Sequence, residues 1–114
     1  MRLTHLMVRR YKHLSHVVLD VDGTQKDFPV YFCIGLNGSG KSTLLEALAL
    51  IFSRISQNEL PGFEFELEYD IRCGGETAHV AVCPGKDHRK GKLSIRVNGG
   101  DPFFTFEGRE KYLP

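Results

Sequence analysis

The sequence has few cysteines, and their spacing does not suit a structural role. Three occur in 114 residues, at Cys33, Cys73 and Cys83, and no two of them form a C-x-x-C pair. An odd number of widely spaced cysteines is untypical of zinc sites and of disulfide frameworks. Reduced thiols are typical of intracellular proteins, so we expect a cytoplasmic protein without a structural metal or a disulfide bond.

Long apolar segments and a strong net charge are also lacking. No apolar run approaches the roughly 20 residues that span a membrane, and the N-terminus lacks the apolar region of a signal peptide, so we expect no membrane association. Fifteen Lys and Arg residues face fourteen Asp and Glu, a net charge of +1. That balance by itself does not indicate nucleic-acid binding, and the length fits one small domain.

The strongest feature that is present is the segment Gly35–Ser42, which reads G-L-N-G-S-G-K-S. It matches the P-loop (Walker A) pattern G-x-x-x-x-G-K-[ST], which follows a buried strand and opens a helix. Pro29–Ile34 is almost wholly apolar, which predicts a strand buried on both faces. A glycine-rich turn that only links strand to helix is the alternative, but such a turn needs no Lys followed by Ser. One helix face is predicted by the spacing of Leu44, Leu48, Ile51, Phe52 and Ile55.

The residue types in this loop suit a nucleoside triphosphate with Mg²⁺. Glycines let the backbone approach oxygen atoms closely, and successive N–H groups at a helix N-terminus form a nest for phosphate. Lys41 would reach the β- and γ-phosphates, the Ser42 hydroxyl would coordinate Mg²⁺, and Thr43 would contact the α-phosphate through its N–H and hydroxyl. The predicted nucleotide-binding residues of the loop are Asn37, Gly38, Ser39, Gly40, Lys41, Ser42 and Thr43.

The rest of the chain has the pattern of antiparallel strands. Phe63–Tyr69 alternates strictly between apolar and acidic residues, which is typical of a half-exposed strand, and Gly74-Gly75 predicts a hairpin turn. The remaining predicted strands are Arg2–Val8, His16–Val21, Thr77–Cys83, Leu93–Val97 and a last one that begins near Phe103, Phe104 and Phe106.

The loop, continued as G-L-N-G-S-G-K-S-T-L-L-E-A-L, resembles the ATP-binding-cassette branch of P-loop ATPases. Within that branch the chain is similar to SMC, RecF and DNA-repair heads and to the AAA ATPases of anti-phage defence. These proteins open with a strand, an aromatic-basic pair and a second strand, and Tyr11 and Lys12 occupy the positions of that pair. The resemblance implies that Lys12 and His13 lie beside the nucleotide phosphates.

The resemblance also implies an α/β fold, the N-terminal subdomain of a P-loop NTPase with an antiparallel β lobe. Residues 1–114 would be part of a head, with the P-loop core at about 1–57 and antiparallel hairpins at about 63–106. The sequence has no apolar strand ending in Asp-Glu, no L-S-G-G signature, no switch His and no Q-loop Gln. The catalytic residues therefore stay unknown, and we expect a fragment or a split subunit that is an ATPase only in a complete head or dimer.

ATP and Mg²⁺ are the cofactors that the resemblance implies. The expected assembly is a homodimer or a larger ATPase complex with possible DNA association, acting in DNA-directed repair or defence. The alternative is a non-hydrolysing module that senses nucleotide or binds another protein and needs a partner chain. An Asp-Glu pair in the remaining polypeptide or in a partner would distinguish the two.

Other charged clusters have simpler interpretations. Arg9 and Arg10 lie in a predicted turn, and the basic stretch Lys86–Lys92 could contact DNA but is more typical of a solvated loop. The carboxylates of Glu64, Glu66 and Glu68 share one strand face, which favours an exposed surface over a metal site. His79 is expected to be a paired or half-exposed strand residue.

Overall fold

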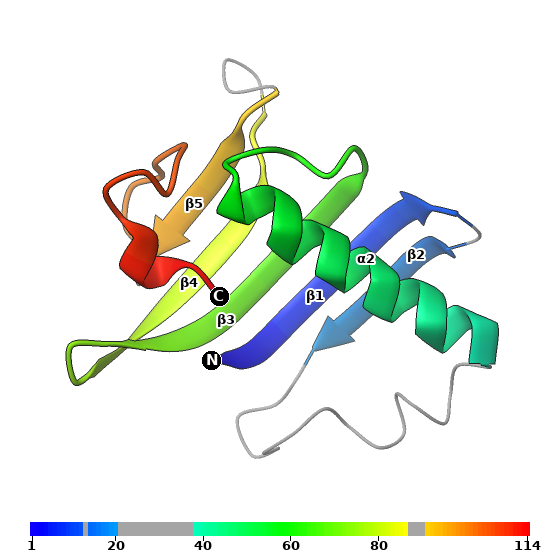
Figure 1. Ribbon diagram of the computed structural model, residues 1–114, viewed down its shortest axis with the longest axis horizontal. Coiled ribbons are helices and arrows are strands. Elements are labelled where there is room, and N and C mark those ends of the chain that lie inside the picture. Colours follow the sequence, from blue (N-terminus) through cyan, green and yellow to red (C-terminus); the bar gives the residue numbers. More distant parts are fainter. Residues whose placement is uncertain (13, 21–37, 87–90) are drawn as a thin grey trace.

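The computed structural model describes residues 1–12, 14–20, 38–86 and 91–114. Its centre is one antiparallel sheet in the order β2-β1-β3-β4-β5 (Figure 1). Helix α2 (Gly38–Ser56) begins at the β2 edge and crosses one face of this sheet, and a short 3-10 helix, η2 (Glu110–Tyr112), lies near the C-terminus. The strands are β1 (Arg2–Tyr11), β2 (Leu14–Asp20), β3 (Glu64–Cys73), β4 (Glu76–Pro84) and β5 (Leu93–Val97).

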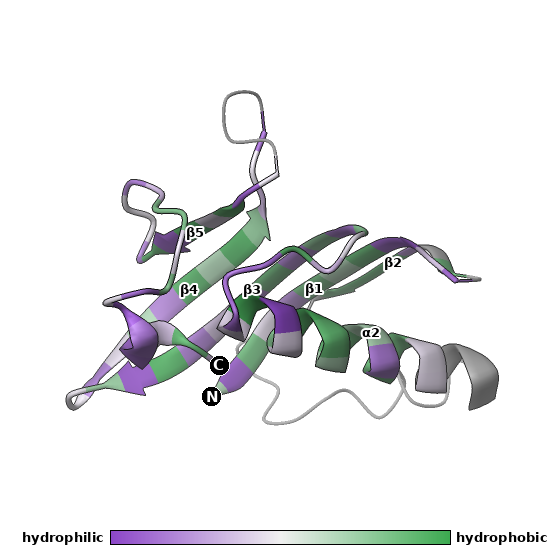
Figure 2. Cartoon of the chain, turned by 45° about the horizontal axis from the view of Figure 1, so that its top comes forward, coloured by the Kyte–Doolittle hydropathy of each residue, from purple (hydrophilic) through white to green (hydrophobic). Residues whose placement is uncertain are grey.

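Strand β3 confirms the prediction from alternation. Phe65, Leu67 and Tyr69 are buried, whereas Glu64 and Glu66 are exposed. Since successive strand side chains point to opposite faces, one face of β3 joins the core and the other faces solvent. Figure 2 shows the same banding of apolar and polar residues along the neighbouring strand β1.

The β3–β4 hairpin also forms as predicted. Gly74 and Gly75 have φ values of 60° and 92°, and Cys73 pairs with Glu76 on either side of them. Two consecutive residues with positive φ are the requirement of the tight turns that match the twist of a two-stranded ribbon. The glycine pair therefore fixes the register of the hairpin.

Helix α2 packs its predicted face on the sheet. Leu44, Ile51 and Ile55 are almost fully buried in the core, and Leu48 and Phe52 are half-buried against it. The buried positions recur with the spacing of one helix face, so the periodicity prediction is confirmed. The helix ends at Ser56, and the N–H of Asn58, a residue with φ of 58°, donates to the Ile55 carbonyl.

The last predicted strand is wrong. Phe103 forms only an isolated bridge, in which its backbone exchanges two 2.9 Å hydrogen bonds with Ile95. Phe106 is buried instead of strand-paired, and its N–H donates to the side chain of Asn58 at 2.6 Å. Pro102 lacks an N–H, and the N–H of Phe106 is bonded to Asn58, two residues beyond α2, so no ladder extends through this segment.

The strand bounds differ modestly from the predicted ones. β1 continues past Val8 to Tyr11, and β2 begins two residues before His16. The predicted strand Pro29–Ile34 lies outside the described residues. The sheet contains strands from both predicted parts, 1–57 and 63–106, and the division into a P-loop core and a hairpin lobe stays a prediction.

Candidate nucleotide site

The second half of the phosphate-loop pattern lies in the first turn of α2. The helix begins at Gly38, so the segment from Gly38 to Ser42 is helical, whereas Gly35–Asn37 lie outside the described residues. The first turn contains no acidic residue. The first backbone N–H groups of a helix have no intrahelical acceptor, and the helix dipole favours an anion there. This helix start can therefore accept phosphate.

Two neighbouring side chains at the start of α2 differ in exposure. Ser42 is exposed, whereas Thr43 is only 7% exposed. A ligand approaching the helix start can therefore reach the Ser42 side chain directly. Thr43 faces the interior, where its side chain is screened from solvent.

The turn between β1 and β2 contacts α2 through Glu46. The Lys12 Nζ lies 2.7 Å from the Glu46 Oε1, and the Tyr11 hydroxyl donates to the same oxygen, also at 2.7 Å. Glu46 follows Ser42 by four residues, so the two share one helix face. The structure thus brings Lys12 to the third turn of the helix, while His13 lies outside the described residues.

The three side chains of this cluster shift one another's titration. The hydrogen bond from Lys12 to Glu46 raises the pKa of Lys12. The hydrogen bond from Lys12 and, to a smaller extent, the one from Tyr11 lower the pKa of the Glu46 carboxyl. The hydrogen bond to Glu46 also raises the pKa of the Tyr11 hydroxyl. Lys12 and Glu46 are therefore a charged pair at neutral pH, and Tyr11 is a neutral donor.

Sequence reasoning missed Glu46 and Phe63 as parts of this cluster. The Tyr11 ring packs against Phe63 with centroids 4.7 Å apart, and the Lys12 ammonium lies 5.7 Å from the Tyr11 ring centroid. One signal for Glu46 was available. Its position four residues after Ser42 puts it on the same side of the helix as the expected magnesium ligand.

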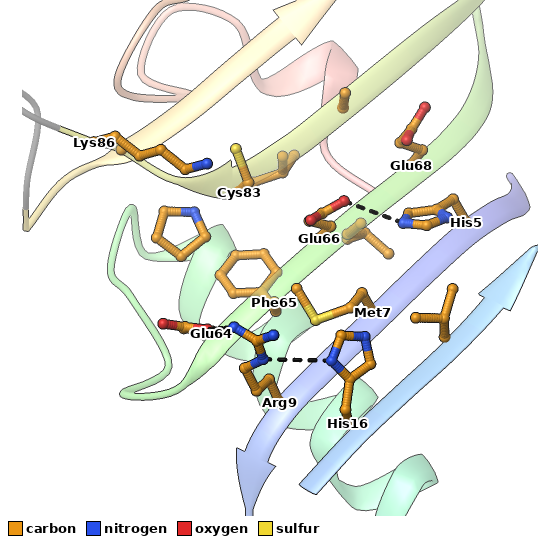
Figure 3. Close-up of a pocket in the computed structure, with 16 residues that line it drawn as sticks. His5, Met7, Arg9, His16, Glu64, Phe65, Glu66, Glu68, Cys83 and Lys86 are labelled. Atoms are coloured by element: carbon orange, nitrogen blue, oxygen red, sulfur yellow. Dashed lines mark hydrogen bonds and ion pairs between the residues drawn. The ribbon is translucent and has the colours of Figure 1, made fainter.

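The sheet face opposite α2 is concave, with a cavity of about 750 Å³. Figure 3 shows the carboxylates of β3 in this cavity beside basic side chains of neighbouring strands. In the cavity Glu64 pairs with Arg9 at 3.2 Å and Glu66 pairs with His5 at 3.3 Å. Glu68 pairs at 2.9 Å with His79 of β4, which does not line the cavity.

These pairs confirm that the acidic stripe is a partly exposed surface and that His79 is a paired residue. Neighbouring strands bring basic side chains to this stripe, namely Arg9 and His5 from β1 and His79 from β4. Arg9 itself lies in β1, not in a turn. In the described ranges, no group of His, Cys, Asp and Glu could hold a metal ion.

The basic stretch Lys86–Lys92 is only partly visible. Lys86 and Lys92 are exposed, and residues 87–90 lie outside the described residues.

The described helices include none that is long and apolar enough to cross a membrane.

A known protein family matches most of this chain. Residues 30–112 match the family model described as "AAA domain, putative AbiEii toxin, Type IV TA system". The chain belongs to this AAA family. The predicted resemblance to RecF and anti-phage ATPase heads is therefore confirmed, and the family implies a P-loop NTPase fold and nucleotide binding.

Two curated relatives are DNA replication and repair proteins RecF from Sodalis glossinidius, one of them from strain morsitans. Each is 31% identical over 111 residues, which cover 89% of this chain and 29% of the relative. The chain thus spans less than a third of the length of these RecF proteins. No solved structure matches.

Proposed function

We propose that this AAA-family chain binds ATP with Mg²⁺ at Gly35–Ser42 and the start of α2. One observation carries the proposal: the G-x-x-x-x-G-K-S pattern runs into a helix that begins at its fourth residue, Gly38. The first backbone N–H groups of a helix have no intrahelical acceptor, and a phosphate can satisfy them. The family match over residues 30–112 supports the same conclusion.

Each loop residue has a proposed role. The backbone of Asn37 to Gly40 cradles the phosphates, and the Lys41 ammonium contacts the β- and γ-phosphates. The exposed hydroxyl of Ser42 is an oxygen donor of the kind that Mg²⁺ prefers, and bound Mg²⁺ would neutralise charge between two phosphates. Thr43 is buried, which favours a contact through its main-chain N–H over one through its hydroxyl.

Lys12 and His13 are proposed to lie beside the phosphates. The ion pair between Lys12 and Glu46 supports this for Lys12, because it holds the ammonium against the helix that follows the loop. A second cation near Lys41 would add attraction for a triphosphate, which is highly charged.

We further propose that hydrolysis occurs only in a complete head or dimer, in the cytoplasm, in DNA-directed repair or defence. Phosphoryl transfer needs an oriented water and positioned charge, and the sequence contains no Asp-Glu pair. The relatives named as DNA replication and repair proteins support a DNA-directed role. A nucleotide-sensing module that needs a partner is the alternative.

Titration of the chain with Mg²⁺–ATP in a calorimeter tests the site. Lys41→Ala should weaken binding by about tenfold or more, because a hydrogen bond from a charged group to phosphate is lost. Lys92→Ala, which removes an exposed lysine outside the loop, is the control and should bind like the unmodified chain. Full affinity in Lys41→Ala would refute the site. Rapid phosphate release by the chain alone would refute its dependence on a larger head.

A further inference from the structure

We propose that Glu46 is a positioning residue, which fixes Lys12 beside the phosphate loop before nucleotide arrives. The proposal rests on the nucleotide site proposed above. It assigns to Glu46 no contact with nucleotide and no part in the chemistry. Its action is through the Lys12 side chain and the β1–β2 turn.

Two donors share a single carboxylate oxygen of Glu46. The Glu46 Oε1 accepts from both the Lys12 Nζ and the Tyr11 hydroxyl, each at 2.7 Å. The donors are adjacent in sequence and the acceptor lies 34 residues beyond Lys12. Two hydrogen bonds on one atom orient a side chain better than one, so the carboxylate and the ammonium constrain each other.

The backbone of the β1–β2 turn has an uncommon conformation. Arg10 and Lys12 have φ values of 60° and 50°, a region that non-glycine residues seldom adopt. Such conformations persist where surrounding contacts fix them. Here the fixing contacts are the ring of Phe63 on Tyr11 and the two bonds to Glu46. The shape of the turn therefore depends on α2.

Glu46 also lies close to the proposed phosphate loop in the sequence. It follows Ser42 by four helical positions, which is a rise of about 6 Å along the helix axis. Lys12 is thus held against a carboxylate that lies about one helical turn beyond the proposed magnesium ligand. A long lysine side chain that is already ordered loses less conformational freedom when it meets an anion. The ammonium also neutralises a carboxylate that would otherwise repel a triphosphate.

Glu46→Gln separates positioning from simple charge. The amide oxygen can still accept from the Tyr11 hydroxyl, but Lys12 loses its anionic partner. We expect the Kd for Mg²⁺–ATP to rise about two- to tenfold, since Lys12 must then be ordered during binding. Because the pair is exposed, the thermal midpoint should move by no more than about 4 °C.

A double-mutant cycle shows whether Glu46 acts through Lys12. Lys12→Met should also raise the Kd, and adding Glu46→Gln to Lys12→Met should cause no further rise. A purely structural role for Glu46 would weaken binding equally in both backgrounds. Equal weakening would therefore overturn the proposal.

Glu59→Gln is the matched control. Glu59 forms an exposed ion pair with Arg54 at 3.1 Å, and its side chain is 54% exposed against 52% for Glu46. This pair lies at the other end of α2, so its loss should leave the Kd unchanged. A rise in Kd as large as that of Glu46→Gln would contradict positional specificity and overturn the proposal.

The two proposals fail in distinguishable ways. Full affinity in Lys41→Ala, or no binding by the unmodified chain, would refute the nucleotide site and Glu46 positioning with it. Loss of binding in Lys41→Ala together with unchanged or tighter binding in folded Glu46→Gln would refute positioning alone. Tighter binding would mean that the carboxylate only repels the phosphates.

Discussion

The two faces of the sheet differ in what their side chains contact. On one face, residues such as Leu6 and Val8 join the core beneath α2. On the other, His5, Met7 and Arg9 line an open concavity in which acidic and basic side chains pair across strands. The apolar face sets where α2 lies. On the charged face the carboxylates of β3 each have a basic partner on a neighbouring strand.

Glu46 on α2 and Glu64 on the open face of the sheet illustrate this difference between the two faces. Glu46 and Glu64 are exposed to similar extents, 52% and 54%, and each pairs with one cation at 2.7 Å and 3.2 Å. Only the partner of Glu46 belongs to a turn that contacts the helix of the phosphate loop. An ion pair alone therefore does not mark a functional site, and its place in the fold must be known.

The largest expected effect comes from the covered face. Ile51→Ala removes a fully buried side chain from α2 and should lower the free energy of unfolding by about 2–5 kcal/mol through lost burial and a cavity. Urea denaturation measures this. Leu45→Ala is the control on the same helix, because Leu45 is 46% exposed and its loss should cost less than about 1 kcal/mol. Similar losses in both variants would mean that α2 does not pack as described.

On the open face, the largest expected effect involves His79. Its ring nitrogens lie 2.9 Å from Glu68 and 2.8 Å from Asp70, and these two hydrogen bonds raise the pKa of His79 above its ordinary 6.5. Protonation is therefore more favourable in the folded state than in the unfolded one. The resulting stability is complete below about pH 6.5 and is lost as pH rises through the folded-state pKa.

His79→Gln should therefore cost most at low pH. Because its side chain is 42% exposed, we expect about 0.5–1 kcal/mol near pH 6 and less near pH 9. Urea denaturation at both values is the measurement. His16→Gln is the control, since His16 accepts from Arg9 and has no carboxylate partner among the contacts described. A loss in His79→Gln that does not change with pH would contradict the charged bridge.

Much of the fold was predictable because it follows from local periodicity. β3 alternates with period two, α2 has an apolar stripe with helical spacing, and Gly74-Gly75 specifies its own turn. The failed strand near Phe103 shows the limit. The conformation of this segment depends on a hydrogen bond between Phe106 and Asn58, which are 48 residues apart. No local sequence pattern predicts such a contact.

The candidate site was predictable in part for the same reason. The phosphate-loop pattern is contiguous, so its residues could be named from sequence. The pairing of Lys12 with Glu46 could not, because it requires the β1–β2 hairpin to fold back on α2. The cations opposite the acidic stripe likewise depend on the register between β1 and β3, which places Arg9 opposite Glu64.

The smallest expected effect is the sharpest test of the contrast between the two glutamates. Glu64→Gln makes the same chemical change as Glu46→Gln, but on the open face. Its pair with Arg9 is exposed on both sides, so the cost to stability should be about 0.2–1 kcal/mol and should shrink in high salt. Urea denaturation at low and high salt measures it. The Kd for Mg²⁺–ATP should not change, and an increase like that of Glu46→Gln would mean that the open face also affects the nucleotide site.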